Sequence, residues 1–162
     1  MQFENDVQRE TFERIQEVLP ELFEDLYHDD DDGHFYVRYG STVLEISIDA
    51  YGPKEAVVTI MSYCVQGVEE PEGLPTMLLE LNHALPLGAF SMVGTDVFFA
   101  HTMFGRDLQP RTLLSAVAAV ADIADEYDDR LCARFGGQTA LERIRDTGGR
   151  ARRKKATTAV EN

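Results

Sequence analysis

The amino-acid sequence predicts an α+β domain in which helices pack against one antiparallel sheet. Segments with the three- and four-residue apolar spacing of helices alternate with segments that have the two-residue spacing of strands. The strand-like segments follow one another through short connections, which join antiparallel neighbours. With 162 residues, of which 44% are apolar, the chain suits one core and one domain. The predicted order is an α-β-β-β-α-β-β-α sandwich.

The first predicted element is an amphipathic helix over residues 6–27, with Asp6 as its candidate cap. Its apolar positions are Phe12, Ile15, Leu19, Leu22, Phe23 and Leu26. Pro20 removes one hydrogen bond inside this helix and predicts a kink or a division into two helices. The acidic run ending at Gly33 predicts a turn.

Three strands are predicted next, because apolar and polar residues alternate over residues 35–39 and 43–49 and a β-branched run covers 56–66. Gly40 and Ser41 predict a tight turn between the first two strands. The next element is a helix over about residues 75–85. Its predicted buried stripe is Leu78, Leu81 and Leu85.

Two further strands are predicted over residues 88–93 and 96–104. The longest helix then begins at Asp107 or Gln109 and stops at a glycine pair, 136–137. Its predicted inner face is Leu113, Val117, Val120, Ala124, Tyr127 and Leu131. A polar segment to Asp146 predicts one more helical turn. The domain is therefore predicted to cover residues 1–146, followed by a disordered basic tail at 147–162.

Charge is distributed unevenly along the chain. There are 29 acidic and 15 basic residues, a net charge of −14. Residues 147–162 hold five basic residues and one acidic residue, so the tail carries +4 and the body −18. Such a body repels phosphate backbones, which predicts no nucleic-acid binding by the folded domain. For the tail, three interpretations stay open: contact with nucleic acid or an acidic partner, contact with the acidic body, or a solvated end.

The sequence also predicts a cytoplasmic protein without a membrane partner. Its longest apolar run, residues 113–121, is shorter than the ~20 residues that cross a bilayer. The N-terminus is acidic, unlike a signal peptide. Cys64 and Cys132 form no disulfide framework and are predicted to be reduced core thiols.

No catalytic motif for nucleophilic, phosphate-binding, metal or redox chemistry occurs in the chain. We therefore predict no enzyme, no catalytic residue, no cofactor and no metal. A calcium loop that begins at His28 fails because its twelfth position is Tyr39 rather than glutamate. A loose metal site at His28, His34 and the acidic run stays open as an alternative. The acidic residues around Asp122 are predicted to form a solvated helix face.

The apolar residues exceed what a sheet with one covered face needs. Val97, Phe99 and Met103 alternate with Phe98 and Phe104, so both faces of this strand are apolar. The strand over 56–66 shows the same pattern. Either the chain's own helices cover both faces, or one face is an interface. The candidate partner-binding residues are Phe90, Met92, Phe98, Phe99 and Met103, some of which must belong to the core.

Several local strings, taken in order, resemble the YbjN-like family, which is related in fold to type III secretion chaperones. They are Tyr39-Gly40-Ser41-Thr42-Val43, Val65-Gln66-Gly67-Val68, Leu81-Asn82, Gly88-Ala89-Phe90, Val97-Phe98-Phe99, Ala124-Asp125, Tyr127-Asp128-Asp129 and Phe135-Gly136-Gly137. The resemblance covers about residues 8–137. It implies a chaperone-like sandwich, often dimeric, that binds segments of other proteins without a catalytic centre. Members have been described as sensory-transduction or stress regulators.

Three functional hypotheses follow. The first is a non-enzymatic binding module, chaperone-like or regulatory, that binds a segment of a client protein. The second is a homodimeric stress or sensory regulator whose apolar face is covered by its second copy. The third is a metal-dependent sensor or an unrecognised enzyme that uses His28, His34, His101 or the acidic residues.

Overall fold

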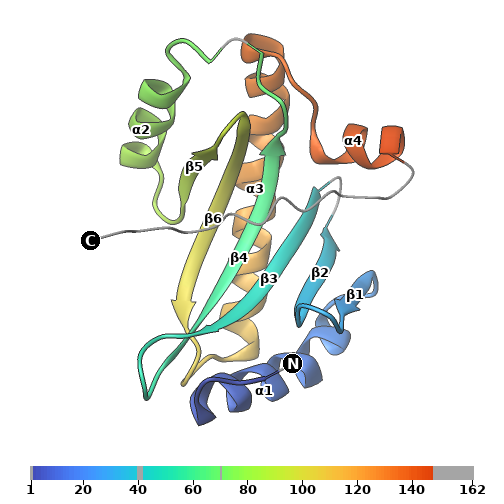
Figure 1. Ribbon diagram of the computed structural model, residues 1–162, viewed down its shortest axis with the longest axis vertical. Coiled ribbons are helices and arrows are strands. Elements are labelled where there is room, and N and C mark those ends of the chain that lie inside the picture. The colour runs from blue at the N-terminus through green and yellow to red at the C-terminus, as the bar shows by residue number, and fades with distance from the viewer. Residues whose placement is uncertain (1, 40–41, 70, 148–162) are drawn as a thin grey trace.

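The computed structural model describes residues 2–39, 42–69 and 71–147 (Figure 1). Its elements are α1 (Asp6–Leu22), β1 (Leu26–Asp29), β2 (His34–Tyr39), β3 (Thr42–Ala50), β4 (Ala56–Val65), α2 (Leu74–Ala84), β5 (Ala89–Val93), β6 (Asp96–Phe104), α3 (Pro110–Phe135) and α4 (Ala140–Thr147). The predicted α+β class with an antiparallel sheet is confirmed.

The six strands form one open sheet in the order β1-β2-β3-β4-β6-β5, and every neighbouring pair is antiparallel. The longest pairings lie in the middle, where Ile60 of β4 stands between Ile46 of β3 and His101 of β6. A bulge between Tyr63 and Val65 shifts the β4–β6 register by one residue. As a result, Cys64 and Val65 are both buried.

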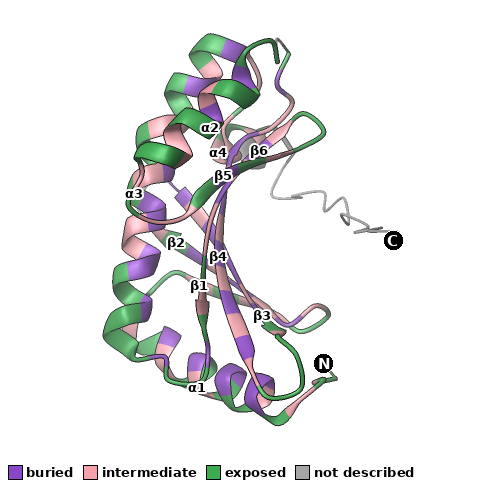
Figure 2. Cartoon of the chain, turned by 90° about the vertical axis from the view of Figure 1, so that its left-hand side faces the viewer, coloured by how far each residue is buried: buried purple, intermediate pink, exposed green. Residues whose placement is uncertain are grey.

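Two of the helices, α2 and α3, lie on one side of the sheet (Figure 2). α3 runs along this side and buries Val117 and Val120, while α1 crosses one end and buries Ile15 and Leu19. α2 packs beside β5. The other side, to the right in Figure 2, has no described helix over its middle. The sequence left open whether the chain's own helices cover both apolar faces of the sheet. Within the described residues, helices cover only one face.

The N-terminal region differs from the prediction. α1 ends at Leu22 rather than at residue 27, and Leu26–Asp29 forms the additional strand β1, paired with β2 through the predicted acidic turn. Pro20 neither divides nor ends the helix early, because it lies in the last turn of α1. The N-cap is Asn5 rather than Asp6, since its side chain accepts the Gln8 N–H at 2.8 Å.

The later elements follow the prediction closely. α2 begins one residue early, and α3 has Gln109 as N-cap and Gly136 as C-cap. Its predicted inner face is buried except for Tyr127, which is half-buried. The predicted final turn is the eight-residue helix α4. The predicted turn at Gly40 and the predicted disorder from residue 148 onward lie outside the described residues.

Among the helices described, none combines the length with the apolar character that a bilayer crossing requires.

Candidate functional site

The side of the sheet opposite α3 is the candidate site, and we call it the open face (Figure 2). Strand alternation and register assign its side chains. They are Tyr27, Asp29, His34, Tyr36, Arg38, Val43, Glu45, Ser47, Asp49, Val57, Thr59, Met61, Tyr63, Ala89, Ser91, Val93, Asp96, Phe98, Ala100, Thr102 and Phe104. α4 lies beside the end of the sheet where β3 begins and β4 ends (Figure 1).

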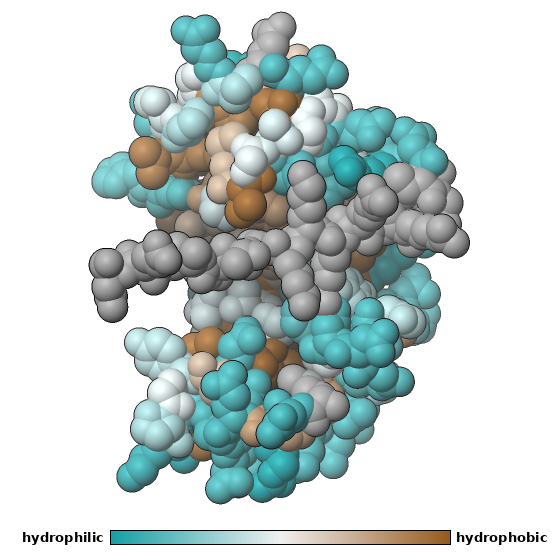
Figure 3. Space-filling model, in the orientation of Figure 1, coloured by the Kyte–Doolittle hydropathy of each residue, from teal (hydrophilic) through white to brown (hydrophobic). Residues whose placement is uncertain are grey.

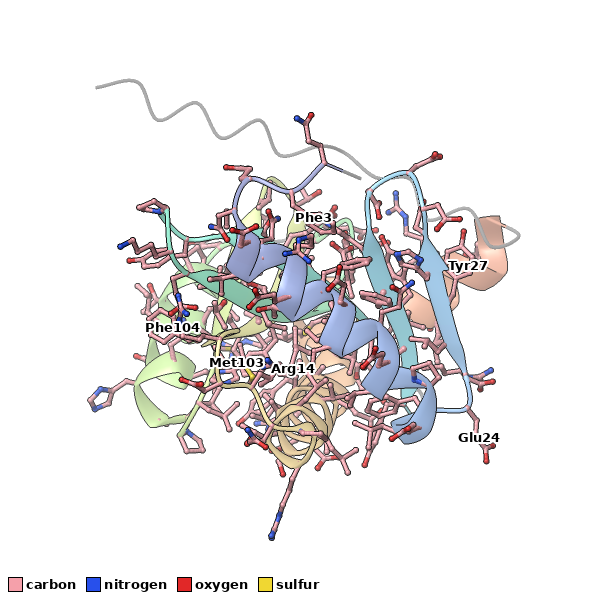
Figure 4. The ribbon with its side chains drawn as sticks, turned by 90° about the horizontal axis from the view of Figure 1, so that it is seen from below. Phe3, Arg14, Glu24, Tyr27, Met103 and Phe104 are labelled. Carbon is pink, nitrogen blue, oxygen red and sulfur yellow. The ribbon has the colours of Figure 1, made fainter. Side chains whose placement is uncertain are left out.

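Aromatic rings are spread across the open face. Near the end of β4 and the start of β6, the Tyr63 and Phe98 rings meet edge to face, with centroids 4.9 Å apart. Toward the margins the rings are more accessible, since Tyr27 is 62% and Phe104 64% exposed. Figure 4 shows Phe104 at the left and Tyr27 at the right, so the two rings are separated across the width of the sheet. In Figure 3, which views this side, brown apolar side chains show among teal hydrophilic ones.

A buried carboxylate lies among these rings. Glu45 is only 8% exposed, although its strand neighbours on this face are not covered by a helix. Its Oε1 accepts a hydrogen bond from the His34 ring Nδ1 at 2.8 Å. Across the strand pairs, Glu45 stands between Tyr36 of β2 and Met61 of β4. The side chains of these neighbours therefore bury the carboxylate between them.

The carboxylate changes the titration of the groups around it. The hydrogen bond to Glu45 raises the pKa of His34, against the opposing effect of burial. Burial, together with the Glu45 charge, raises the pKa of Tyr63 to about 12 and also raises that of Tyr36. Both phenols thus stay protonated at neutral pH and are available as hydrogen-bond donors.

The remaining charges on the open face are mostly negative. Asp29, Asp49 and Asp96 lie on it, the last accepting the Gly67 N–H at 2.9 Å. Besides His34, strand alternation places one basic residue of the described chain on this face, Arg38. The face therefore combines aromatic contact area with a negative potential.

The five predicted partner-binding residues divide between the two sides of the sheet. Phe90 and Phe99 are buried in the core, and Met92 and Met103 pack against it. Only Phe98 belongs to the open face. Figure 4 shows the separation for two sequence neighbours, with Met103 nearer α3 than Phe104. Whether Phe98 contacts a client stays a prediction.

Sequence reasoning missed the centre of this site. Tyr36 and Glu45 were assigned to strands but not to a surface, because alternation gives the two sides of a strand without saying which one is covered. The sequence signal that could have found Tyr36 is an aromatic residue on the strand face that also carries the charged Arg38. The burial of Glu45 has no sequence signal of that kind.

One outer strand of the sheet is protected at its edge. The Asn82 side chain in α2 accepts the Phe90 N–H at 2.6 Å and donates to the Phe90 carbonyl at 3.0 Å. The amide thus bonds to the backbone of β5 as a neighbouring strand would.

The alternative metal site is not supported by the geometry. His28 lies on the core face of β1, stacked on Phe35 at 4.5 Å, whereas His34 lies on the open face. Alternation therefore separates the two rings by the sheet itself. Among the described residues, no group of three or more His, Cys, Asp or Glu side chains is placed to hold a metal ion.

The two cysteines are free and poorly nucleophilic. Burial raises the pKa of Cys64 to about 12 and that of the half-buried Cys132 to about 11. Both thiols are therefore protonated at neutral pH, the unreactive form.

The acidic row of α3 is mainly solvated, as predicted. Asp122, Asp125 and Asp129 are exposed. Asp128 differs, since it is half-buried and burial raises its pKa to about 6, helped by the neighbouring carboxylates. Its Oδ1 accepts the Asp129 N–H at 2.6 Å. This group therefore carries a desolvation cost at neutral pH.

Comparison with protein families matches residues 10–143 to the family described as T3SS (YopN, CesT) and YbjN peptide-binding chaperone 1, or TY-Chap1. The chain belongs to this family. The TY-Chap1 match extends from α1 into α4 and so includes every strand of the sheet. It confirms the resemblance found in the sequence strings and supports a non-enzymatic, peptide-binding role. A comparison with functionally curated proteins finds no match.

Proposed function

We propose that this TY-Chap1 protein binds an extended segment of a client protein on its open face, without catalysis. The observation that carries the proposal is a sheet side with accessible aromatic rings and no described helix over its middle. Apolar area of this kind is normally removed from water by a partner. Family membership gives the class of partner, a peptide segment.

The face suits a client better than the protected sheet edge. At β5 the backbone of Phe90 already bonds to Asn82, so a client strand would have to displace that amide. At the other edge, β1 has only four residues and continues into an acidic turn. Both features discourage the addition of a strand. A segment lying across the face instead can place its side chains between the exposed rings.

The chemistry of the face favours apolar and basic client side chains. An apolar side chain buried against Phe98 or Tyr63 contributes roughly 1.5–3 kcal/mol before the cost of ordering the segment. Basic side chains meet Asp29 and Asp49 and can lie over the tyrosine rings. The negative body, at −18, accelerates the encounter with such a client.

A panning experiment with random peptides tests the proposal. Peptides of about ten residues are selected for binding to the full chain, because this length is enough to cross the ~24 Å width of six strands. The affinity of the selected peptides is then measured by fluorescence anisotropy. We expect selected peptides to be apolar and basic. Phe98→Asp should weaken the affinity of the protein for these peptides by about tenfold or more, a loss of roughly 1.4 kcal/mol of binding free energy.

The matched control is Leu79→Asp. Leu79 is 69% exposed on α2, outside the open face, so this variant adds the same charge without touching the site. Circular dichroism verifies that both variants fold. Equal affinity of the Phe98→Asp and Leu79→Asp variants for the peptides contradicts the proposal.

A second copy of the chain is the competing occupant of the face. Light scattering of the full chain at micromolar concentration distinguishes the two. A dimer that Phe98→Asp dissociates, combined with no selected peptide, would assign the face to self-association and overturn the client proposal.

A further inference from the structure

We propose that the chain's own C-terminal segment, residues 148–162, binds the open face as an internal ligand that a client has to displace. The inference goes beyond client binding, since it concerns a contact within one chain. Three observations support it: the place where the described chain ends, the length of the segment that follows, and the opposite charges of this segment and the open face.

The described chain ends next to the open face. α4 ends at Thr147, and it contacts β3 and β4, the two central strands (Figure 1). The Gln66–Gln138 bridge holds the start of this region against the end of β4. The segment that follows Thr147 therefore starts beside the sheet.

The segment is long enough to cross the face. From Thr147 to Lys155 there are eight residues, which span at most about 27 Å when extended. Six strands at a spacing of about 4.8 Å make a sheet about 24 Å wide. The chain length thus allows the basic residues, at 150 and 152–155, to reach the rings of β2, β4 and β6 without unfolding α4.

The charges of the segment and the face are opposite. The segment holds five basic residues and one acidic residue, Glu161. The face presents Asp29, Glu45, Asp49 and Asp96. Both sets belong to one chain, so their effective concentration is on the order of 1 mM, as for modules joined by a short linker.

Glu45 gives the contact a defined centre. The carboxylate is 8% exposed, and the half-buried rings of Tyr36 and Tyr63 lie beside it. A guanidinium group that approaches this point can stack on a ring, where the charge of the buried carboxylate beneath also attracts it. Among the basic residues of the segment, three are arginines, at positions 150, 152 and 153.

A single-tryptophan reporter tests the contact. The chain contains no tryptophan, so Phe98→Trp places one fluorophore on the open face of the full-length protein. We compare acrylamide quenching of this reporter with quenching after all five basic residues of the segment are changed to glutamine. We expect the neutralised segment to raise quenching and shift emission to the red. Salt at about 1 M should act in the same direction, because it screens the charges.

The control reporter is Leu79→Trp on α2, which should not respond to the change in the segment. A synthetic peptide of residues 148–162, added to the neutralised Phe98→Trp variant, should restore protection. Its affinity should fall when Glu45→Gln is also present. Circular dichroism verifies that each variant folds.

Two results would overturn the inference. One is equal quenching of the Phe98→Trp reporter with the native and the neutralised segment, with no response to the peptide. The other is a segment that binds a single-stranded oligonucleotide while this reporter stays fully accessible. No client is present in these measurements, so their failure leaves the proposed client binding intact, and failed peptide selection leaves this inference intact.

Discussion

The His34 ring donates a 2.8 Å hydrogen bond to the Glu45 carboxylate on the side of the sheet that no described helix covers. A buried carboxylate on an uncovered face is stable only when its neighbours compensate its charge. Here the compensation comes from a residue that titrates near neutral pH. The pair therefore links the electrostatics of the open face to pH.

The first prediction concerns the titration of His34. Because Glu45 raises the pKa of His34 above the ordinary 6.5, the pair stabilises the fold fully below about that pH and loses this contribution as pH rises through the folded-state pKa. Glu45→Gln should lower the His34 midpoint in an NMR titration toward or below 6.5. The exposed His83 serves as the internal reference. An unchanged His34 midpoint would disprove the claim that Glu45 raises the pKa of His34.

The second prediction compares two neighbours on β6. Phe99 is fully buried, whereas Phe98 is half-buried on the open face. Phe99→Ala should lower the free energy of unfolding by about 3–5 kcal/mol, and Phe98→Ala by about 1 kcal/mol. Urea denaturation of both variants measures the difference. Equal losses would mean that the two sides of the sheet are wrongly assigned.

The third prediction uses two glycines with the same backbone angle. Gly52 and Gly88 both have φ of +67°, but a Cβ at Gly52 meets nothing within 4 Å, while one at Gly88 lies 2.5 Å from the Phe99 ring. Gly52→Ala should cost about 1–2 kcal/mol for the left-handed conformation alone. Gly88→Ala should cost a further 1–3 kcal/mol or so for the clash. Thermal unfolding of the pair checks this, and identical melting temperatures would contradict the packing at β5 and β6.

The fourth prediction concerns the protected edge. Asn82→Ala leaves the Phe90 N–H and carbonyl without their partner and should lower the free energy of unfolding by about 1–3 kcal/mol. It should also increase self-association through β5, measured by light scattering. His83→Ala, an exposed neighbour on the same helix, is the control. If both variants behave alike, Asn82 does not protect the edge.

The fifth prediction concerns Asp128. Its pKa is raised to about 6, so the folded chain binds this proton more tightly than the unfolded chain and stability falls as pH rises from about 4 to 6. Asp128→Asn should therefore raise the melting temperature at pH 7 and leave it nearly unchanged at pH 4. Asp122→Asn, exposed on the same helix, should have little effect at either pH. A destabilised Asp128→Asn variant at pH 7 would contradict the assigned burial cost.

Much of the fold could be predicted because local pattern and tertiary packing agree. Leu113, Val117 and Val120 recur at helical spacing and are the residues that α3 buries against the sheet. In the same way, the two-residue alternation of β6 separates Phe98 from Phe99 correctly. The glycine after α3 marks its end, as expected for a C-terminal cap.

The remainder depends on tertiary contacts that a local pattern does not contain. Leu26 continues the helical spacing of α1, yet it lies in β1 because pairing with Val37 satisfies the backbone there. The open face could not be recognised because its exposure depends on where α3 packs. Similarly, Glu45 appears in the sequence as an ordinary polar strand residue, and only its neighbours across the sheet bury it.

The most direct test of the central claim is NMR mapping of a selected apolar and basic peptide on the ¹⁵N-labelled full chain. The account predicts that shift changes concentrate on β2, β4 and β6, around Tyr36, Tyr63 and Phe98, with little change along the acidic row of α3. Changes centred on α3 around Asp122, with an unperturbed open face, would contradict the account.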